Sequence, residues 1–265
     1  LRSTMFDTHC HLTFDCYEGR VPDLLEQAVA DGVRGCISIS TTTGDLDRLV
    51  GLADEHDRVW CSAGVHPLYS DRPIDWTAME RAARHPKCIA WGELGLDHHY
   101  PEPARSLQTS VLEEQIARIE GWTSEGLAKP VVVHCRDAFD ALLPILDRCD
   151  LPNDRFVFHC FTGDESQVRA VLDFGAWVSF TGIVTFANAR EVAEASDLVP
   201  DDRIMVETDA PFLTPEPHRT VRPNEPRYVR CVADFLARRR GLDPDEFDRI
   251  LDDNAARFFG IRLPG

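Results

Sequence analysis

Short apolar runs alternate along the chain with longer segments in which apolar residues recur at helical spacing. The runs predict strands at Met5–Thr8, Cys36–Ile39, Val59–Gly64, Cys88–Trp91, Val131–His134, Phe156–His159, Ala176–Phe180 and Arg203–Glu207. The amphipathic segments between them predict helices, among them Pro22–Ala30, Leu46–His56, Leu107–Glu125 and Asp164–Phe174. Eight strands alternating with helices predict an α/β fold, a (β/α)₈ TIM barrel. A doubly wound sheet is the alternative, but no G-x-G-x-x-G follows an early strand.

The boundaries of the barrel follow from the ends of this pattern. Residues 1–4 precede a natural start at Met5, and we interpret them as a tag remnant or a disordered start. No interdomain linker or short repeat interrupts the rest, although the proline-rich stretch Pro211–Pro226 predicts a long loop after the last strand. The sequence therefore predicts one domain over residues 5–265.

Composition narrows the functional classes. Hydrophobic residues make up 43% and charged residues 28% of the 265, which is typical of globular proteins. No apolar run approaches the roughly 20 residues of a spanning helix, so we expect no membrane association. Twenty-eight basic against 45 acidic residues give a net charge of −17, which opposes a broad nucleic-acid-coating surface. The negative net charge remains compatible with a nuclease, because bound metal ions can supply positive charge locally.

Cysteine usage and charge also bear on compartment and assembly. Nine cysteines without a C-x-x-C pair, and no secretory leader, predict reduced thiols in a cytoplasmic protein. The acidic surface favours a monomer without an obligate protein partner, and it is compatible with a high-salt cytoplasm.

Candidate metal ligands lie at the carboxyl ends of the predicted strands or directly after them. In a barrel these positions meet at one rim, where functional side chains gather. The two histidines of an H-x-H pair on an extended strand point to the same face. Four histidines and two carboxylates provide ligands for two divalent ions, and glutamate on a middle strand is the candidate bridge. The set is His9, His11, Glu93, His134, His159 and Asp209.

Several motifs together resemble the TatD family of metal-dependent deoxyribonucleases, within the amidohydrolase superfamily. The similarity runs from Met5 to the C-terminus. It is carried by Asp7-Thr8-His9-Cys10-His11-Leu12, Gly64-Val65-His66-Pro67, Gly92-Glu93-Leu94-Gly95-Leu96-Asp97, Ser179-Phe180-Thr181-Gly182, Glu207-Thr208-Asp209-Ala210-Pro211, Asn224-Glu225-Pro226 and Asn254-Ala255-Ala256-Arg257-Phe258-Phe259-Gly260. Two departures, Pro223 between Arg222 and Asn224 and Leu68 where a second histidine is common, concern local substrate contacts.

The resemblance implies a binuclear site and a role for each ligand. His9, His11 and Asp209 bind one ion, His134 and His159 bind the second, and Glu93 bridges the two. The expected ions are Mg²⁺ or Mn²⁺, with Zn²⁺ as an alternative. Two such ions activate a shared water to hydroxide and stabilise transition-state charge.

Further roles are expected beside the ions. Asp209 is the expected base as well as a ligand, so the catalytic residues are Asp209, Glu93 and His66. His66 and Arg136 are the candidate phosphate contacts. The alternatives are a structural His66 in a turn, and an ion pair between Arg136 and Asp137 or Asp140.

Two more carboxylates are ambiguous. Asp97 is either a support for a ligand histidine or a helix N-cap. Glu207 is interpreted as structural support for Arg222 or the Asn224 loop.

The function expected from this site is hydrolysis of DNA phosphodiesters, as a 3′–5′ exodeoxyribonuclease on single strands. The partner is then a transiently bound nucleic acid. The alternative is a metal-dependent hydrolase of C–N or ester bonds, such as a small amidohydrolase or an aminoacyl-tRNA deacylase, because metals polarise carbonyl oxygens as well. A scaffold with a vestigial site predicts a missing ligand, and none is missing.

Overall fold

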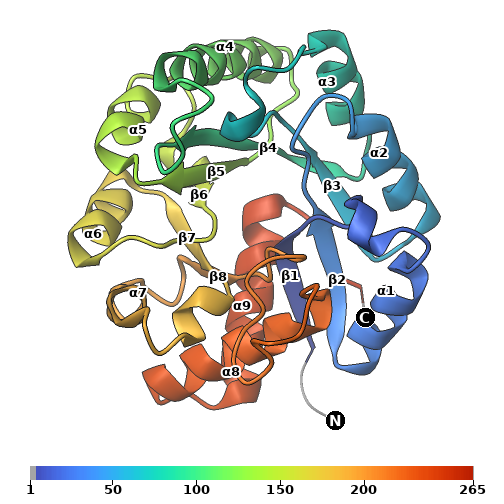
Figure 1. The fold of residues 1–265 in the computed structure, drawn as a ribbon, viewed down its shortest axis with the longest axis vertical. Coiled ribbons are helices and arrows are strands. Elements are labelled where there is room, and N and C mark those ends of the chain that lie inside the picture. Colours follow the sequence, from blue (N-terminus) through green and yellow to red (C-terminus); the bar gives the residue numbers. More distant parts are fainter. Residues whose placement is uncertain (1–3, 265) are drawn as a thin grey trace.

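The computed structural model describes residues 4–264 and shows a (β/α)₈ barrel (Figure 1). The interpretation of residues 1–4 thus falls almost wholly outside the described residues. Within residues 4–264, eight parallel strands form one sheet whose spatial order is the chain order. They are β1 (Met5–Cys10), β2 (Val33–Ser38), β3 (Val59–Ala63), β4 (Cys88–Asp97), β5 (Val131–Arg136), β6 (Phe156–Phe158), β7 (Trp177–Phe180) and β8 (Ile204–Val206).

The barrel closes between its first and last strands at their carboxyl ends. The His11 N–H donates to the Ala210 carbonyl at 2.7 Å, and the Asp209 N–H donates to the His9 carbonyl at 2.9 Å. These bonds join the segments that carry three of the predicted ligands, so the contacts that close the barrel also position part of the site.

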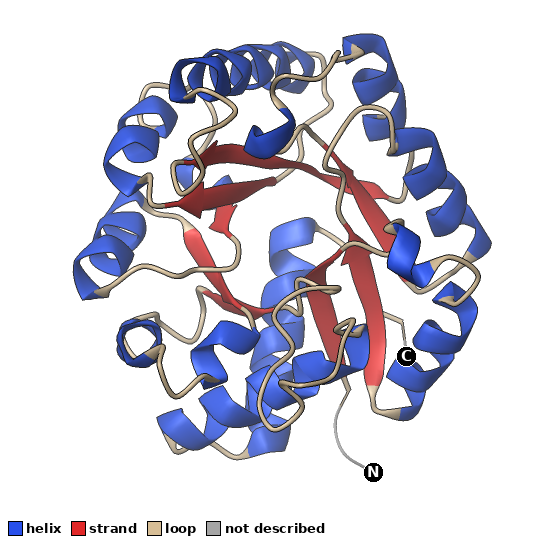
Figure 2. Cartoon of the chain, in the orientation of Figure 1, coloured by secondary structure: helices blue, strands red, loops and turns tan. Residues whose placement is uncertain are grey.

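Helices surround the strands (Figure 2). Local sequence explains their ends: in α6, Asp164 and Gln167 form a reciprocal capping box, and Gly175 ends the helix with φ 101°. The helices are α1 (Val21–Ala30), α2 (Leu46–Glu55), α3 (Trp76–Ala83), α4 (Arg105–Ser124), α5 (Phe139–Leu146), α6 (Glu165–Phe174), α7 (Arg190–Ser196), α8 (Val229–Arg240) and α9 (Pro244–Phe259).

Strand β4 is longer than the apolar pattern predicts. The expected end at Trp91 is wrong, because pairing with β5 resumes at Leu94 and continues to Asp97. Between Trp91 and Leu94, β4 advances three residues while β5 advances two. Gly92 makes this possible: its φ is 121°, and a Cβ there would lie 2.5 Å from the Val132 carbonyl oxygen. Glu93 therefore lies within a strand and not after one.

The inside of the barrel is apolar at the end where the strands begin. Phe6, Trp60 and Trp177 pack there with Phe258 and Phe259 of α9. The Trp177 and Phe258 rings lie 5.3 Å apart, and the Asn254 amide of α9 donates to the Ile204 carbonyl at the start of β8. Helix α9 thus covers this end of the barrel, leaving the opposite end for polar residues.

The remaining apolar residues pack between the strands and the outer helices. No helix among residues 4–264 is long and apolar enough to cross a membrane. All nine cysteines lie in the described range and are free thiols.

Candidate metal centre

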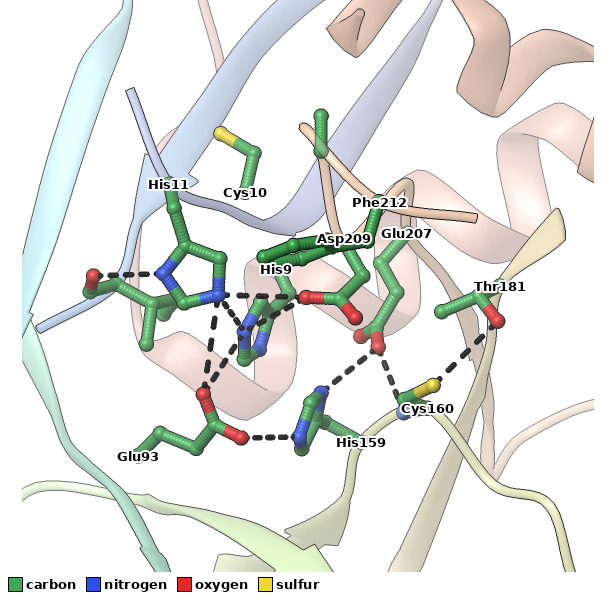
Figure 3. A network of polar contacts seen from close by, with 12 residues as sticks. His9, Cys10, His11, Glu93, His159, Cys160, Thr181, Glu207, Asp209 and Phe212 are labelled. Atoms are coloured by element: carbon green, nitrogen blue, oxygen red, sulfur yellow. Dashed lines mark hydrogen bonds and ion pairs between the residues drawn. The ribbon is translucent and has the colours of Figure 1, made fainter. Parts of the chain in front are cut away.

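The predicted ligand residues converge at the carboxyl end of the barrel (Figure 3). A register shift in β1 helps to gather them: Asp7 pairs with Cys36 and Cys10 with Ser38, so three steps of β1 oppose two of β2. The extra residue changes the alternation of side chains. Thr8 therefore faces the interior toward Val206, and His9 does so toward Glu93.

Glu93 lies at the middle of the cluster. Its Oε2 is 3.3 Å from His9 Nε2 and 3.9 Å from His11 Nε2. Its Oε1 is 2.6 Å from His159 Nε2 and 2.7 Å from His134 Nδ1. Although burial opposes its charged form, the surrounding imidazoles hold the pKa of Glu93 well below its usual range. An ionised carboxylate thus directs one oxygen to each pair of histidines.

The first group consists of His9, His11 and Asp209. The two Nε2 atoms are 3.3 Å apart, and Asp209 Oδ1 lies 3.3 Å from His11 and 3.7 Å from His9. Burial alone would raise the pKa of Asp209, but the contact with His11 and the nearby imidazoles lower it. The carboxylate is therefore ionised, and these three residues could hold a metal ion.

The second group lies on the other side of Glu93. His134 Nδ1 is 3.3 Å from His159 Nε2 and 3.2 Å from His66 Nε2. His66, Glu93 and His134 are also close enough to one another to hold an ion. His66, predicted as a phosphate contact, is thus as near to this group as the predicted ligand His159.

Hydrogen bonds on the outer side of the rings distinguish His66 from His11, His134 and His159. His11 Nδ1 contacts the Ile39 carbonyl at 3.1 Å, so a ring hydrogen lies there and Nε2 is the nitrogen that a metal ion in the centre would bind. In His66 the Nδ1 instead accepts from the Leu68 N–H at 3.0 Å. Burial lowers the pKa of His66, so the ring is neutral and its hydrogen lies on Nε2. His66 therefore presents a donor to the centre, whereas metal ligation requires a lone pair.

Two buried carboxylates orient the histidines of the second group. Asp97 Oδ2 is 3.0 Å from Nε2 of the predicted ligand His134, and Asp97 ends β4 and is not a helix N-cap. Glu207 Oε1 is 3.1 Å from His159 Nδ1. Both contacts favour a ring hydrogen on the nitrogen that faces away from Glu93, so the nitrogen that faces Glu93 is the one a metal ion would bind.

The interpretation of Glu207 as a support for Arg222 or the Asn224 loop is wrong. Its Oε1 also accepts from the Cys160 N–H at 2.7 Å (Figure 3). Its Oε2 accepts from Ser179 Oγ at 2.6 Å. Glu207 points into the barrel because it lies two residues after Met205, which also faces the interior. The alternation of side chains along β8 is therefore the sequence signal that places Glu207 inside the barrel.

The centre opens into a cavity of about 650 Å³, a size suited to a small ligand. Arg136 lines it with its guanidinium 5.4 Å from the Tyr100 ring centroid. The alternative ion pair with Asp137 or Asp140 does not form among the described residues, and Asp137 instead contacts His99 at 3.1 Å. Arg136 is thus available to a ligand.

Strained backbone borders the same cavity. Among residues 4–264, every non-glycine residue with positive φ lines it. Such conformations cost about 1–3 kcal/mol each and cluster at functional sites. The four are Asp137 (φ 54°), Cys160 (φ 44°), Asp209 (φ 53°) and Leu213 (φ 59°).

Comparison with known proteins identifies the family of the chain. The family model described as TatD related DNase matches residues 6–260. The chain is 40% identical to the uncharacterized metal-dependent hydrolase YcfH of Escherichia coli K12, covering 97% of this chain and 96% of that protein. It is 31% identical to the 3′-5′ ssDNA/RNA exonuclease TatD of Salmonella typhimurium, covering 97% and 99%. The crystal structure of YJJV, a TatD homologue from E. coli K12, superposes with a TM-score of 0.90 at 27% identity, covering 97% and 98%.

Proposed function

Because the chain belongs to the TatD-related DNase family of metal-dependent hydrolases, we propose that it hydrolyses phosphodiester bonds of single-stranded nucleic acid from the 3′ end. The proposed catalytic unit is the whole barrel, residues 5–265, acting with two divalent ions. The name of the Salmonella relative supports the choice of substrate, and the arrangement of the site supports the choice of chemistry.

One observation carries this proposal: the two oxygens of Glu93 face two different histidine pairs. Oε2 faces His9 and His11, and Oε1 faces His134 and His159. A carboxylate shared in this way would hold two divalent cations at once. Such pairs act in phosphodiester hydrolysis by clamping the attacking and leaving oxygens.

The residues fit a pair of divalent ions on their own chemistry. The Nε2 atoms of His9 and His11 lie 3.3 Å apart and both face Glu93, so one cation could bind to both nitrogens. Divalent ions in these positions lower the pKa of a water molecule and polarise phosphoryl oxygens. His9, His11 and Asp209 would hold one ion, His134 and His159 the other, and Glu93 both.

The protein's own groups then bind the substrate and move the proton. Asp209 is ionised and 13% exposed toward the cavity, so its carboxylate would accept the proton of the attacking water. His66 would donate its Nε2 hydrogen to a phosphate oxygen, because its Nδ1 is occupied by Leu68. Arg136 would bind the same phosphate with its planar guanidinium.

The test is degradation of an end-labelled single-stranded oligonucleotide with Mg²⁺, Mn²⁺, Zn²⁺ or EDTA. We expect metal-dependent laddering from the 3′ end, and a loss of at least about 100-fold in Asp209→Asn. Asp173→Asn is the matched control, because Asp173 is exposed on α6 and is not among the residues that line the cavity.

A different outcome would redirect the assignment. If protein loaded with about two ions per chain cleaves no oligonucleotide in any of these metals, the nuclease proposal fails. Hydrolysis of C–N or ester bonds, tested on aminoacyl-tRNA and dipeptides, would then take its place.

A further inference from the structure

Phe212 is a large apolar side chain that the fold holds in solvent. It is 49% exposed and lines the cavity next to Asp209. Its backbone is fixed: its N–H donates to the Asp209 carbonyl at 2.9 Å, and its carbonyl accepts from the Asn224 amide at 2.5 Å. Asn224 is fully buried and is also bound by the Tyr17 hydroxyl. An exposed ring on a braced loop is typical of a binding position.

The Phe212 ring belongs to a small aromatic cluster at the metal centre. Phe14 lies 5.9 Å from it at an interplanar angle of 81°, and Phe14 itself stacks on the ligand His11 at 4.9 Å. Phe212 lies beside Asp209 in the close-up view (Figure 3). The cluster thus places aromatic surface directly beside the group that would hold an ion.

The opposite wall of the cavity carries a second ring. Tyr100 is 45% exposed and lies under the Arg136 guanidinium. Among the described residues that line the cavity, Arg136 is the one lysine or arginine. With so little positive charge from side chains, recognition of a nucleic acid must rest on the ions and on uncharged contacts. Stacking of bases on aromatic rings is the uncharged contact that single strands provide.

We propose that Phe212, braced by Phe14, is a stacking platform for the nucleobase next to the scissile phosphodiester. This proposal rests on the proposed function. A base can reach this ring only when it is unstacked and unpaired, so the subsite selects frayed or single-stranded 3′ ends. Every base has a flat π-face, and the contact is therefore tolerant of sequence. The ring recognises DNA and RNA ends alike, since it contacts no sugar hydroxyl.

The experiment compares Phe212 variants on paired substrates. Each oligonucleotide, in DNA and RNA form, ends in either a normal nucleotide or an abasic one. With normal ends, Phe212→Ala should lower kcat/KM by about tenfold, mainly through KM, from the usual strength of base stacking. With abasic ends, the wild type and Phe212→Ala should differ by less than about twofold.

Conservative variants separate stacking from plain apolar contact. Phe212→Tyr keeps the ring and should retain activity, whereas Phe212→Leu keeps apolar area and should lose as much as Phe212→Ala. Val29→Ala, at a 42% exposed apolar side chain on α1, is the surface control and should act as the wild type.

Each contrary result has one meaning. Equal losses on normal and abasic ends, or full activity in Phe212→Leu, overturn the stacking platform while the nuclease stands. A loss confined to DNA or to RNA shows recognition beyond the base and overturns the shared subsite. A wild type that degrades neither substrate refutes the nuclease proposal itself.

Discussion

The two ends of the barrel are built from the same strands and have opposite chemistry. In β5, Val132 faces the interior at the amino end, and His134 lies two residues further along. In β6 and the loop that follows it, Val157 and His159 repeat this spacing. One face of each strand therefore changes from apolar to ligand-bearing within a single alternation.

The two ends also differ in side-chain packing and in backbone conformation. The amino end, covered by α9, packs Phe6, Trp60 and Phe258 around the strands. The carboxyl end gathers buried carboxylates, imidazoles and left-handed backbone, each costly to the fold. The contrast indicates that packing at one end stabilises the strand positions that the other end requires.

The largest expected effect comes from weakening the amino end. Phe258 is 2% exposed and contacts Trp177, so Phe258→Ala should lower the free energy of unfolding by about 3–5 kcal/mol. Urea denaturation measures the loss. Activity per folded molecule should stay within about twofold of the wild type, because the metal centre lies at the other end.

Phe212→Ala is the matched change at the carboxyl end. Its ring is half exposed, so the free energy of unfolding should change by no more than about 0.5 kcal/mol. If Phe258→Ala abolished activity in fully folded protein, or Phe212→Ala unfolded the barrel, the division between the two ends would be wrong.

The amino end of the barrel was the easier part to predict from the sequence. Strands β5 and β6 follow from their apolar runs, and the histidines that follow identify the rim. The apolar pattern does not predict the continuation of β4, because Gly92, Glu93 and Gly95 interrupt it. Those glycines serve close backbone contacts with β5, which no local pattern reveals.

The loop after β8 is a second limit of sequence reasoning. The stretch after Asp209 has no hydrophobic period, so its conformation could not be predicted beyond the absence of regular structure. The position of Phe212 depends on a hydrogen bond from Asn224, twelve residues later. Glu207 was predictable in principle, because its parity with Met205 directs it into the barrel.

The gain in the free energy of unfolding on metal binding should depend on the carboxyl end of the barrel and not on the amino end. Ions present at about 100 times their Kd should raise the free energy of unfolding by about 2.7 kcal/mol over the EDTA-treated protein. Phe258→Ala should keep this increment, since distant sites are additive. Glu93→Gln should lose it, because each oxygen of Glu93 serves a different ligand group. An increment that survives in Glu93→Gln would place the stabilising ions elsewhere.

The last prediction concerns Glu207, which contacts the ring of His159 and belongs to neither of the two proposed ligand groups. Glu207→Gln keeps the shape of the side chain and removes the charge behind His159 Nδ1. The neighbouring Ser179 and Thr8 hydroxyls can rotate to suit the amide, so the fold should be retained. Metal affinity, measured by calorimetry, should fall by about 10- to 100-fold, as it does when the partners of ligand histidines are replaced. Asp97→Asn makes the same change behind His134 and should weaken binding to a similar extent. Unchanged metal affinity in both variants would show that packing alone orients these two rings. The carboxyl end of the barrel would then depend on side-chain packing, as the amino end does.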